Sequence, residues 1–173
     1  ILNELTSGGP RNISPSELCK ILGEQINNPE SILYWAAKNN IPVYCPAITD
    51  GSLGDIAFFH QINEINKGNQ QLFIDLLADT AALNKRAIES TKTGILVVGA
   101  GIVKHAILNA NMMREGADYA VYINTSAEFD GSDSGAEPEE AKSWGKVAAD
   151  ANTVKVVCDA TIALPLIIAG SYL

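Results

Sequence analysis

The stretch GILVVGAGIVKHAILNANMM, residues 94–113, decides the fold class. Residues 94–98 form a continuous apolar run of strand length, and Gly99-Ala100-Gly101 then turns the chain. Residues 102–113 follow with the apolar spacing of a helix. A strand that is apolar throughout is typical of a parallel sheet covered on both faces. The stretch therefore predicts one strand–turn–helix unit of an α/β fold.

The same alternation of strand and helix continues in both directions from this unit. Further strands are expected at residues 41–45, 72–75, 119–123 and 153–158. Further helices are expected at residues 14–26, 29–39, 55–65 and 78–90, from Pro138 onward, and at 162–172. Residues 1–13 are predicted to be an irregular segment before the first helix. We therefore predict an α/β fold with a Rossmann-like parallel sheet and helices on both faces.

Composition narrows the class of protein. A hydrophobic content of 47% and a charged content of 18% are typical of a soluble globular domain. The net charge of -8 argues against a nucleic-acid surface. The most apolar run, 160–170, contains Pro165 and is too short for a membrane span, which takes about 20 residues. Three cysteines far apart in sequence indicate buried thiols in a reducing compartment and no metal site, so a cytoplasmic location is expected.

The polar segments that follow the predicted strands are expected to meet at one edge of the sheet. They are residues 46–55, 99–105, 124–135 and 158–161. The glycines at 99 and 101 either form a plain tight turn or let a nucleotide phosphate approach the backbone, and Lys104 leaves the GxGxxG fingerprint incomplete. Asp55 and Asp159 either cap helices or bind a ligand.

The second informative stretch is EFDGSDSGAEPEEAKSWGK, residues 128–146. Its first half is a loop of turn-forming residues, and Pro138 opens a helix on which Glu140 and Trp144 share a face. Carboxylates beside an indole suit a cationic, partly apolar ligand. Trp144 is either a core anchor or part of that site, and Lys146 is either a solvated surface residue or a covalent catalyst.

Two residues outside this loop are also open to two interpretations. His105 is either a surface or packing residue or a group that transfers protons. Tyr122, at the end of a strand, either packs in the core or lines a pocket with Asn124.

Four segments together resemble the deoxyhypusine synthase family. They are AITDGSLGD (47–55), VKHAILNANMMREGADYAVYINT (103–125), EFDGSDSGAEPEEAKSWGK (128–146) and the later CDA with its proline (158–165). The resemblance implies an enzyme that uses NAD to oxidise spermidine and transfers its aminobutyl group to one lysine of a translation factor. The family commonly has a further glycine where this chain has Ala100, and a second histidine where it has Ala106.

The resemblance also implies a role for each site residue. Lys146 is expected to form the covalent imine, and His105 to accept a proton. The residues expected around spermidine are Asp55, Asn109, Tyr122, Gly131, Ser132, Asp133, Glu140 and Trp144. The residues expected near NAD are Asp50, Gly99, Gly101, Thr125, Ser126, Asp159 and Ala160.

The length of the resemblance implies that residues 1–173 form the C-terminal portion of a single synthase-like domain. Residues 1–40 are expected to be a helical lead-in, and residues 41–173 the alternating catalytic portion. The expected partners are spermidine, the acceptor translation factor and a companion chain carrying the N-terminal half, in a tetrameric assembly. Two alternatives are a homospermidine synthase, with putrescine as acceptor, and a non-catalytic regulatory paralogue that activates a partner subunit.

Overall fold

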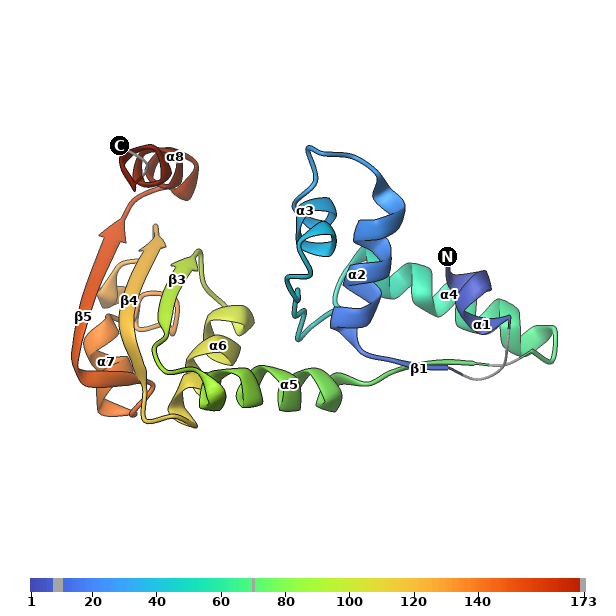
Figure 1. The fold of residues 1–173 in the computed structure, drawn as a ribbon, viewed down its shortest axis with the longest axis horizontal. Helices are drawn as coiled ribbons and strands as arrows, with labels where there is room; N and C mark the ends of the chain where they lie inside the picture. Colours follow the sequence, from blue (N-terminus) through green and yellow to red (C-terminus); the bar gives the residue numbers. More distant parts are fainter. Residues whose placement is uncertain (8–10, 70, 172–173) are drawn as a thin grey trace. The chain divides into compact units, whose positions relative to one another are not determined.

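The computed structural model describes residues 1–7, 11–69 and 71–171 (Figure 1). The chain separates into two compact units, Ile1–Ala82 and Leu83–Leu173, and the boundary falls inside helix α5 (Leu76–Glu89). Each unit has its own cluster of buried apolar side chains. Lys146, the predicted covalent catalyst, belongs to the second unit.

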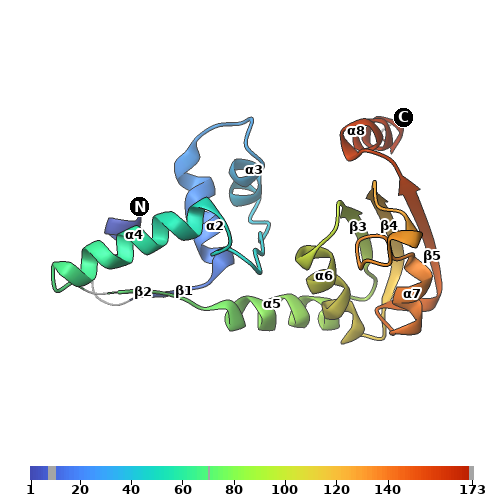
Figure 2. The same cartoon turned by 180° about the vertical axis from the view of Figure 1, so that it is seen from behind.

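The first unit is mainly helical. Before α5, its elements are α1 (Leu2–Thr6), β1 (Arg11–Ile13), α2 (Pro15–Ile26), α3 (Ile32–Lys38), α4 (Ser52–Asn66) and β2 (Leu72–Ile74). The strands β1 and β2 pair in parallel, with Arg11 opposite Leu72 (Figure 2). The buried cluster of this unit consists of Ile13, Leu18, Cys19, Ile48 and Leu72.

Helix α2 begins where its sequence predicts. The Ser14 hydroxyl accepts a hydrogen bond from the Glu17 backbone N–H at 3.2 Å, and the Glu17 carboxylate accepts one from the Ser14 N–H at 3.3 Å. This reciprocal pair is a capping box, which satisfies two donors that the first turn leaves free. Ser16, in the same turn, donates from its N–H to Asp79 of α5 at 2.8 Å. The capped end of α2 is thereby tied to the start of α5.

The second unit is a parallel α/β layer. After α5, its elements are β3 (Gly94–Val98), α6 (Ile102–Met112), β4 (Ala117–Asn124), the short helix η1 (Glu128–Asp130), α7 (Pro138–Ser143), β5 (Val147–Val157) and α8 (Ala160–Ser171). The strand order is β3-β4-β5, and both pairings are parallel. Val97, Tyr122 and Lys155 are neighbours across the three strands. The predicted parallel α/β architecture is confirmed.

Helices α6 and α7 cover the face of the sheet that carries Tyr122. Ile95 and Val97 of β3 are buried there against Leu108 of α6 and Ala141 of α7. Because side chains alternate along a strand, Leu96 points to the opposite face, where its side chain is 51% exposed. Tyr119 and Val154, its neighbours on that face, are 47% and 53% exposed. The opposite face of this unit therefore presents large apolar side chains.

Several predicted boundaries are wrong. Residues 41–45 form no strand, because the run is short and Pro42 lacks the N–H that a strand ladder needs. The lead-in at residues 1–13 contains α1 and β1 instead of irregular chain alone. Strand β5 begins at Val147, ahead of the expected residue 153. Trp144 follows the end of α7 instead of lying on the helix.

Among the described residues, no helix combines the length and apolar character needed to cross a membrane.

The tight turn at Gly116 generates a prediction about stability. Gly116 has φ +103°, and a Cβ there would lie 2.5 Å from the backbone nitrogen of Ala148. Gly116→Ala is expected to lower the free energy of unfolding by about 3 kcal/mol, since backbone strain and overpacking both contribute. Gly131→Ala is the matched control, because Gly131 has φ +66° but no atom within 4 Å of its Cβ position. It should cost about 1 kcal/mol. Equal losses in urea unfolding of the two variants would contradict the close contact.

Candidate active site

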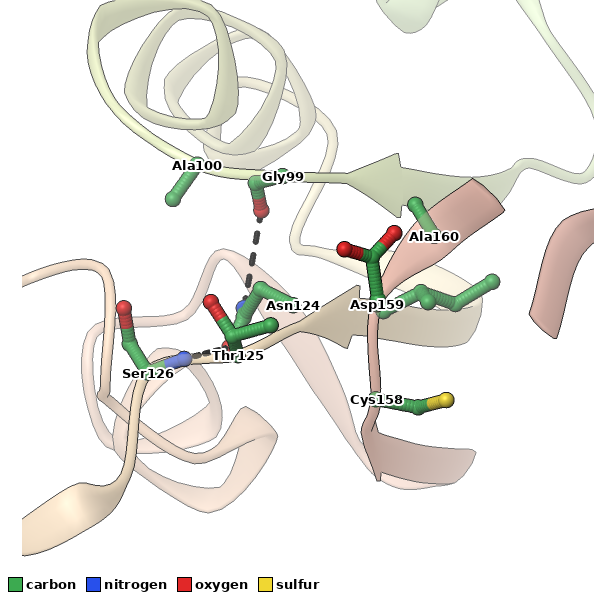
Figure 3. A pocket seen from close by; sticks show the side chains of 9 residues that line it. Gly99, Ala100, Asn124, Thr125, Ser126, Cys158, Asp159 and Ala160 are labelled. Atoms are coloured by element: carbon green, nitrogen blue, oxygen red, sulfur yellow. Dashed lines mark hydrogen bonds between the residues drawn. The ribbon is translucent and has the colours of Figure 1, made fainter. Parts of the chain in front are cut away.

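A cavity of about 330 Å³ lies at the carboxyl ends of the three parallel strands of the second unit (Figure 3). Residues that directly follow or end each strand line it: Gly99 and Ala100 after β3, Asn124 to Ser126 at the end of β4, and Cys158 to Ala160 after β5. Its volume is at the low end of the range for small-molecule sites, roughly 300–1,000 Å³. The edge of the sheet at which the sequence predicts a ligand site therefore carries a cavity.

Asn124 links two of the segments that line the cavity. Its side-chain amide donates to the Gly99 carbonyl at 3.5 Å, and its side-chain oxygen accepts from the Ser126 N–H at 3.2 Å (Figure 3). Gly99 and Gly101 have φ values of +87° and +84°, which favour glycine. Both are needed because the chain reverses here from β3 into α6.

Asp159 caps the start of α8 and also lines the cavity. One of its carboxylate oxygens accepts from the Thr161 N–H at 2.8 Å and from the Thr161 hydroxyl at 2.6 Å, at the start of α8. These bonds from the Thr161 side chain and backbone lower the pKa of Asp159, so the carboxylate stays charged near neutral pH. The same residue lines the cavity at the sheet edge.

The residues of this cavity fit a dinucleotide. The amino-terminal turn of α6, entered through two glycines, is suited to a phosphate. Asp159 and the hydroxyls of Thr125 and Ser126 can bond to ribose hydroxyls. The structure thus brings together five of the residues expected near NAD: Gly99, Thr125, Ser126, Asp159 and Ala160. Gly101 lies in the same turn, while Asp50 belongs to the first unit and is exposed there.

A second, smaller cavity of about 20 Å³ lies beneath α6 and α7. Five residues expected around spermidine or as catalyst line it: Tyr122, Asp133, Glu140, Trp144 and Lys146. Lys104 and Glu137 line it as well, and the sequence did not single them out as site residues. This cavity is therefore the candidate substrate site.

Tyr122 is the most deeply buried of the side chains that line the small cavity. It is 0% exposed, and its hydroxyl has no hydrogen-bond partner among the described residues. Burial raises the pKa of Tyr122 to about 12, and the charges of Asp133 and Glu140 act in the same direction. Tyr122 is thus a neutral donor with an unused hydroxyl, since buried polar groups normally have a partner.

The carboxylates of the small cavity differ in whether a lysine of the chain already pairs with them. Glu137 forms an ion pair with Lys155 at 3.2 Å, and the Lys155 side chain is 3% exposed. For Asp133 and Glu140, no ion pair is found within the described part of the chain. These two carboxylates are free to hold a cationic group of a ligand.

Trp144 and Lys146 lie just after the end of α7. Gly145, with φ +68°, reverses the chain after the helix, and the Lys146 N–H donates to the Ala141 carbonyl at 2.9 Å. Lys146 is half-buried directly before β5. Trp144 is 64% exposed, so its interpretation as a core anchor is wrong. Its indole is accessible to a ligand instead.

The other predicted site residues line neither cavity. His105 and Asn109 lie one turn apart on α6 and bond to each other, with 3.2 Å between the Asn109 amide nitrogen and His105 Nδ1. Gly131 and Ser132 are exposed in the loop before α7. Asp55 is exposed in the first turn of α4, in the first unit.

Sequence reasoning missed Lys104, which lines the small cavity, and Lys155, which bonds to the loop beside it, although each left a signal. Lys104 precedes Leu108 by one helical turn, so it falls on the buried stripe of α6. Lys155 stands inside the apolar run 153–158, on the same side of the sheet as Tyr122. A lysine in an apolar stripe indicates a buried partner, because its charge must be compensated.

The sequence profile of the family described as deoxyhypusine synthase matches residues 1–171. The chain belongs to the deoxyhypusine synthase family. It is 52% identical over 159 residues to the deoxyhypusine synthase of Kluyveromyces lactis, and 55% identical over 161 residues to that of Arabidopsis thaliana. It is also 53% identical over 161 residues to homospermidine synthase 2 of Senecio vernalis.

Each of these alignments covers 92% of this chain but only 41–43% of the relative. The chain thus spans about two fifths of the length of these curated relatives. A crystal structure from Entamoeba histolytica, of a protein assigned as a deoxyhypusine synthase, resembles it with a TM-score of 0.70 and 36% identity. That likeness covers 97% of this chain and 52% of the other.

The unpartnered hydroxyl of Tyr122 generates a prediction that needs no ligand. Tyr122→Phe is expected to raise the free energy of unfolding by up to about 1 kcal/mol, because it removes a buried polar group that lacks a bond. Tyr119→Phe, at a half-exposed site of the same strand, should change it by less than about 0.5 kcal/mol. Urea unfolding followed by circular dichroism measures both. A loss of 1 kcal/mol or more in Tyr122→Phe would mean that the hydroxyl is bonded in the folded protein.

Proposed function

We propose that this chain forms the catalytic part of a deoxyhypusine synthase. The proposed enzyme transfers the aminobutyl group of spermidine to a specific lysine of a translation factor, through an imine on Lys146. The observation that carries the proposal is the small cavity, where Lys146 lies with an accessible indole and two carboxylates that hold no cation. A nucleotide-type cavity at the adjoining edge of the same sheet supports it.

Spermidine matches the chemistry of the small cavity. Asp133 and Glu140 are proposed to pair with its ammonium groups, and the Trp144 indole to pack against its methylenes or attract a cation. The Tyr122 hydroxyl, which lacks a partner among the described residues, is proposed to bond to an amine of the substrate. Asp55 and Asn109, with Gly131 and Ser132, remain proposed contacts.

The proposed chemistry is assigned to two residues. His105 accepts the proton of the secondary amine as that amine is oxidised to an imine. Lys146 then attacks the imine carbon, 1,3-diaminopropane departs, and an imine to Lys146 remains. The acceptor lysine displaces Lys146 from this imine. NAD, held by Gly99, Gly101, Asp159 and their neighbours, would accept the hydride in the first step. The NADH would then return it to the imine on the acceptor lysine, which would become the secondary amine of the product.

Two other functions remain in competition. Homospermidine synthases are as similar to the chain as the deoxyhypusine synthases are, at 53% identity. Product analysis with putrescine and with the protein acceptor separates these two activities. A regulatory paralogue is the third possibility, and it predicts that Lys146→Ala leaves the activity of the assembled complex unchanged.

We further propose that the chain works with a companion that carries the N-terminal half of the family's usual chain, in a tetrameric assembly. Support comes from the exposed apolar side chains of Leu96, Tyr119 and Val154 on one sheet face. Apolar surface of this kind is typical of a face that another chain covers. Because the acceptor is a translation factor, we place the reaction in the cytoplasm.

The first prediction from this function concerns covalent trapping. The protein, purified with the chains that accompany it, is incubated with NAD and labelled spermidine and then reduced with borohydride. Peptide mass spectrometry should find the label on Lys146, because only a lysine imine is fixed by reduction. Lys146→Ala should abolish labelling. Lys142→Arg keeps the charge that pairs with Glu139 and should label as the unsubstituted protein does. Label on another lysine, or none in NAD-loaded protein, would contradict the proposal.

The second prediction concerns assembly. Native mass spectrometry of the active preparation should show this chain together with a second, different chain, and the isolated chain should lose at least about 99% of the activity. The expected reason is that the exposed apolar face at Leu96, Tyr119 and Val154 needs a partner to cover it in the active assembly. A monodisperse and fully active preparation of the 173-residue chain alone would refute the companion.

A further inference from the structure

The loop between η1 and α7 is held by two buried lysines from different elements. Lys104 of α6 is 2% exposed, and its ammonium donates to the carbonyl of Asp133 at 2.5 Å and to that of Ala136 at 3.5 Å. Lys155 of β5 donates to the carbonyl of Gly135 at 2.5 Å. Three carbonyls of one short loop therefore bond to fixed cations.

Lys104 bonds to the backbone of Asp133 and leaves its carboxylate free. No ion pair within 4.0 Å joins the two side chains in the described part of the chain. The ammonium also lies 4.8 Å from the ring centroid of Tyr122, where the face of the ring attracts a cation. Burial lowers the pKa of Lys104, and the nearby charge of Asp133 opposes that shift. Lys104 thus satisfies its charge without using a carboxylate that the ligand needs.

We infer that Lys104 is a positioning residue for the substrate site. By fixing the carbonyls of residues 133 and 136, it holds the Asp133 carboxylate in the small cavity that Lys146 also lines. It acts on the carboxylate through the backbone of the loop. The inference rests on the proposed function only in naming spermidine as the ligand, since the contacts themselves are properties of this chain.

Two backbone amides of the loop can report directly on this role of Lys104. The backbone N–H groups of Gly135 and Ala136 donate to the Ser132 carbonyl at 3.0 and 3.2 Å, within the segment that Lys104 fixes. If Lys104 holds the segment, its removal should increase opening of these two bonds, and hydrogen exchange measures that opening. The amides of β4 lie in the sheet and should exchange at an unchanged rate.

The experiment compares Lys104→Met, which keeps the length and loses the charge, with Lys104→Arg, which keeps the charge and donors. Lys92→Met, at an exposed lysine of the same unit, is the matched control. Exchange at Gly135 and Ala136 should be at least about tenfold faster in Lys104→Met and should recover in part in Lys104→Arg. The control should match the unsubstituted protein. If Lys104→Met does not fold, Lys104→Gln, which keeps a donor without the charge, takes its place.

Steady-state kinetics of the same proteins, with their accompanying chains, tests the consequence for the site. Lys104→Met should raise the KM for spermidine by about 10- to 100-fold, the range expected when bonds to a charged group are lost. The kcat at saturating spermidine should fall by no more than about threefold, since the loss is in binding. Lys104→Arg should restore most of the KM.

Each result that differs from these expectations contradicts a particular part of the inference. Unchanged exchange at Gly135 and Ala136 means that Lys104 does not hold the loop. Faster exchange with an unchanged KM means that the loop does not set ligand binding. If the unsubstituted protein binds no spermidine, the proposed function fails, while the exchange comparison still decides whether Lys104 fixes the segment.

Discussion

The parallel pairing of β3, β4 and β5 is the constraint on which the candidate site depends. It brings the carboxyl ends of three strands to one edge, so residues far apart in sequence, such as Gly99, Asn124 and Asp159, surround one cavity. The same register sets Tyr122 beside Lys155 on the face that α6 and α7 cover. A shift of one residue would turn Tyr122 to the opposite face and dismantle the small cavity.

Most of the fold was predictable because its signals are local. The apolar run at 94–98 and the glycines that end it act within a few residues, and the structure confirms the strand and the turn. The capping box at Ser14, which begins α2, is equally local. The errors have a common physical origin. Strand β1 is polar at Arg11 and Asn12 and exists because β2 pairs with it, whereas the apolar run at 41–45 finds no partner strand in the structure. Pairing between distant segments therefore decided what local pattern did not.

The site was predictable to a similar degree. The polar residues after each strand follow from topology, and the resemblance to the deoxyhypusine synthases added Lys146 and its neighbours. Local sequence does not separate a solvated lysine from a buried one, however, because the difference lies in the partner. Lys104 finds carbonyls 29 and 32 residues away, and Lys155 finds one 20 residues away. The exposure of Trp144 is likewise a consequence of where α7 ends, which its apolar character did not reveal.

Strand β4 contributes a residue to each cavity, so the residue spacing along the strand sets how far apart these two residues are. Tyr122 belongs to the small cavity and Asn124 to the nucleotide-type cavity, two positions along on the same side of the strand. Two residues of a strand span about 7 Å, roughly the width of one aromatic ring with its van der Waals shell. Ligand groups that reached Tyr122 and Asn124 from the two cavities would therefore lie close together along one strand. A transfer between them would need neither a tunnel nor a swinging carrier, since one rigid strand already sets the gap.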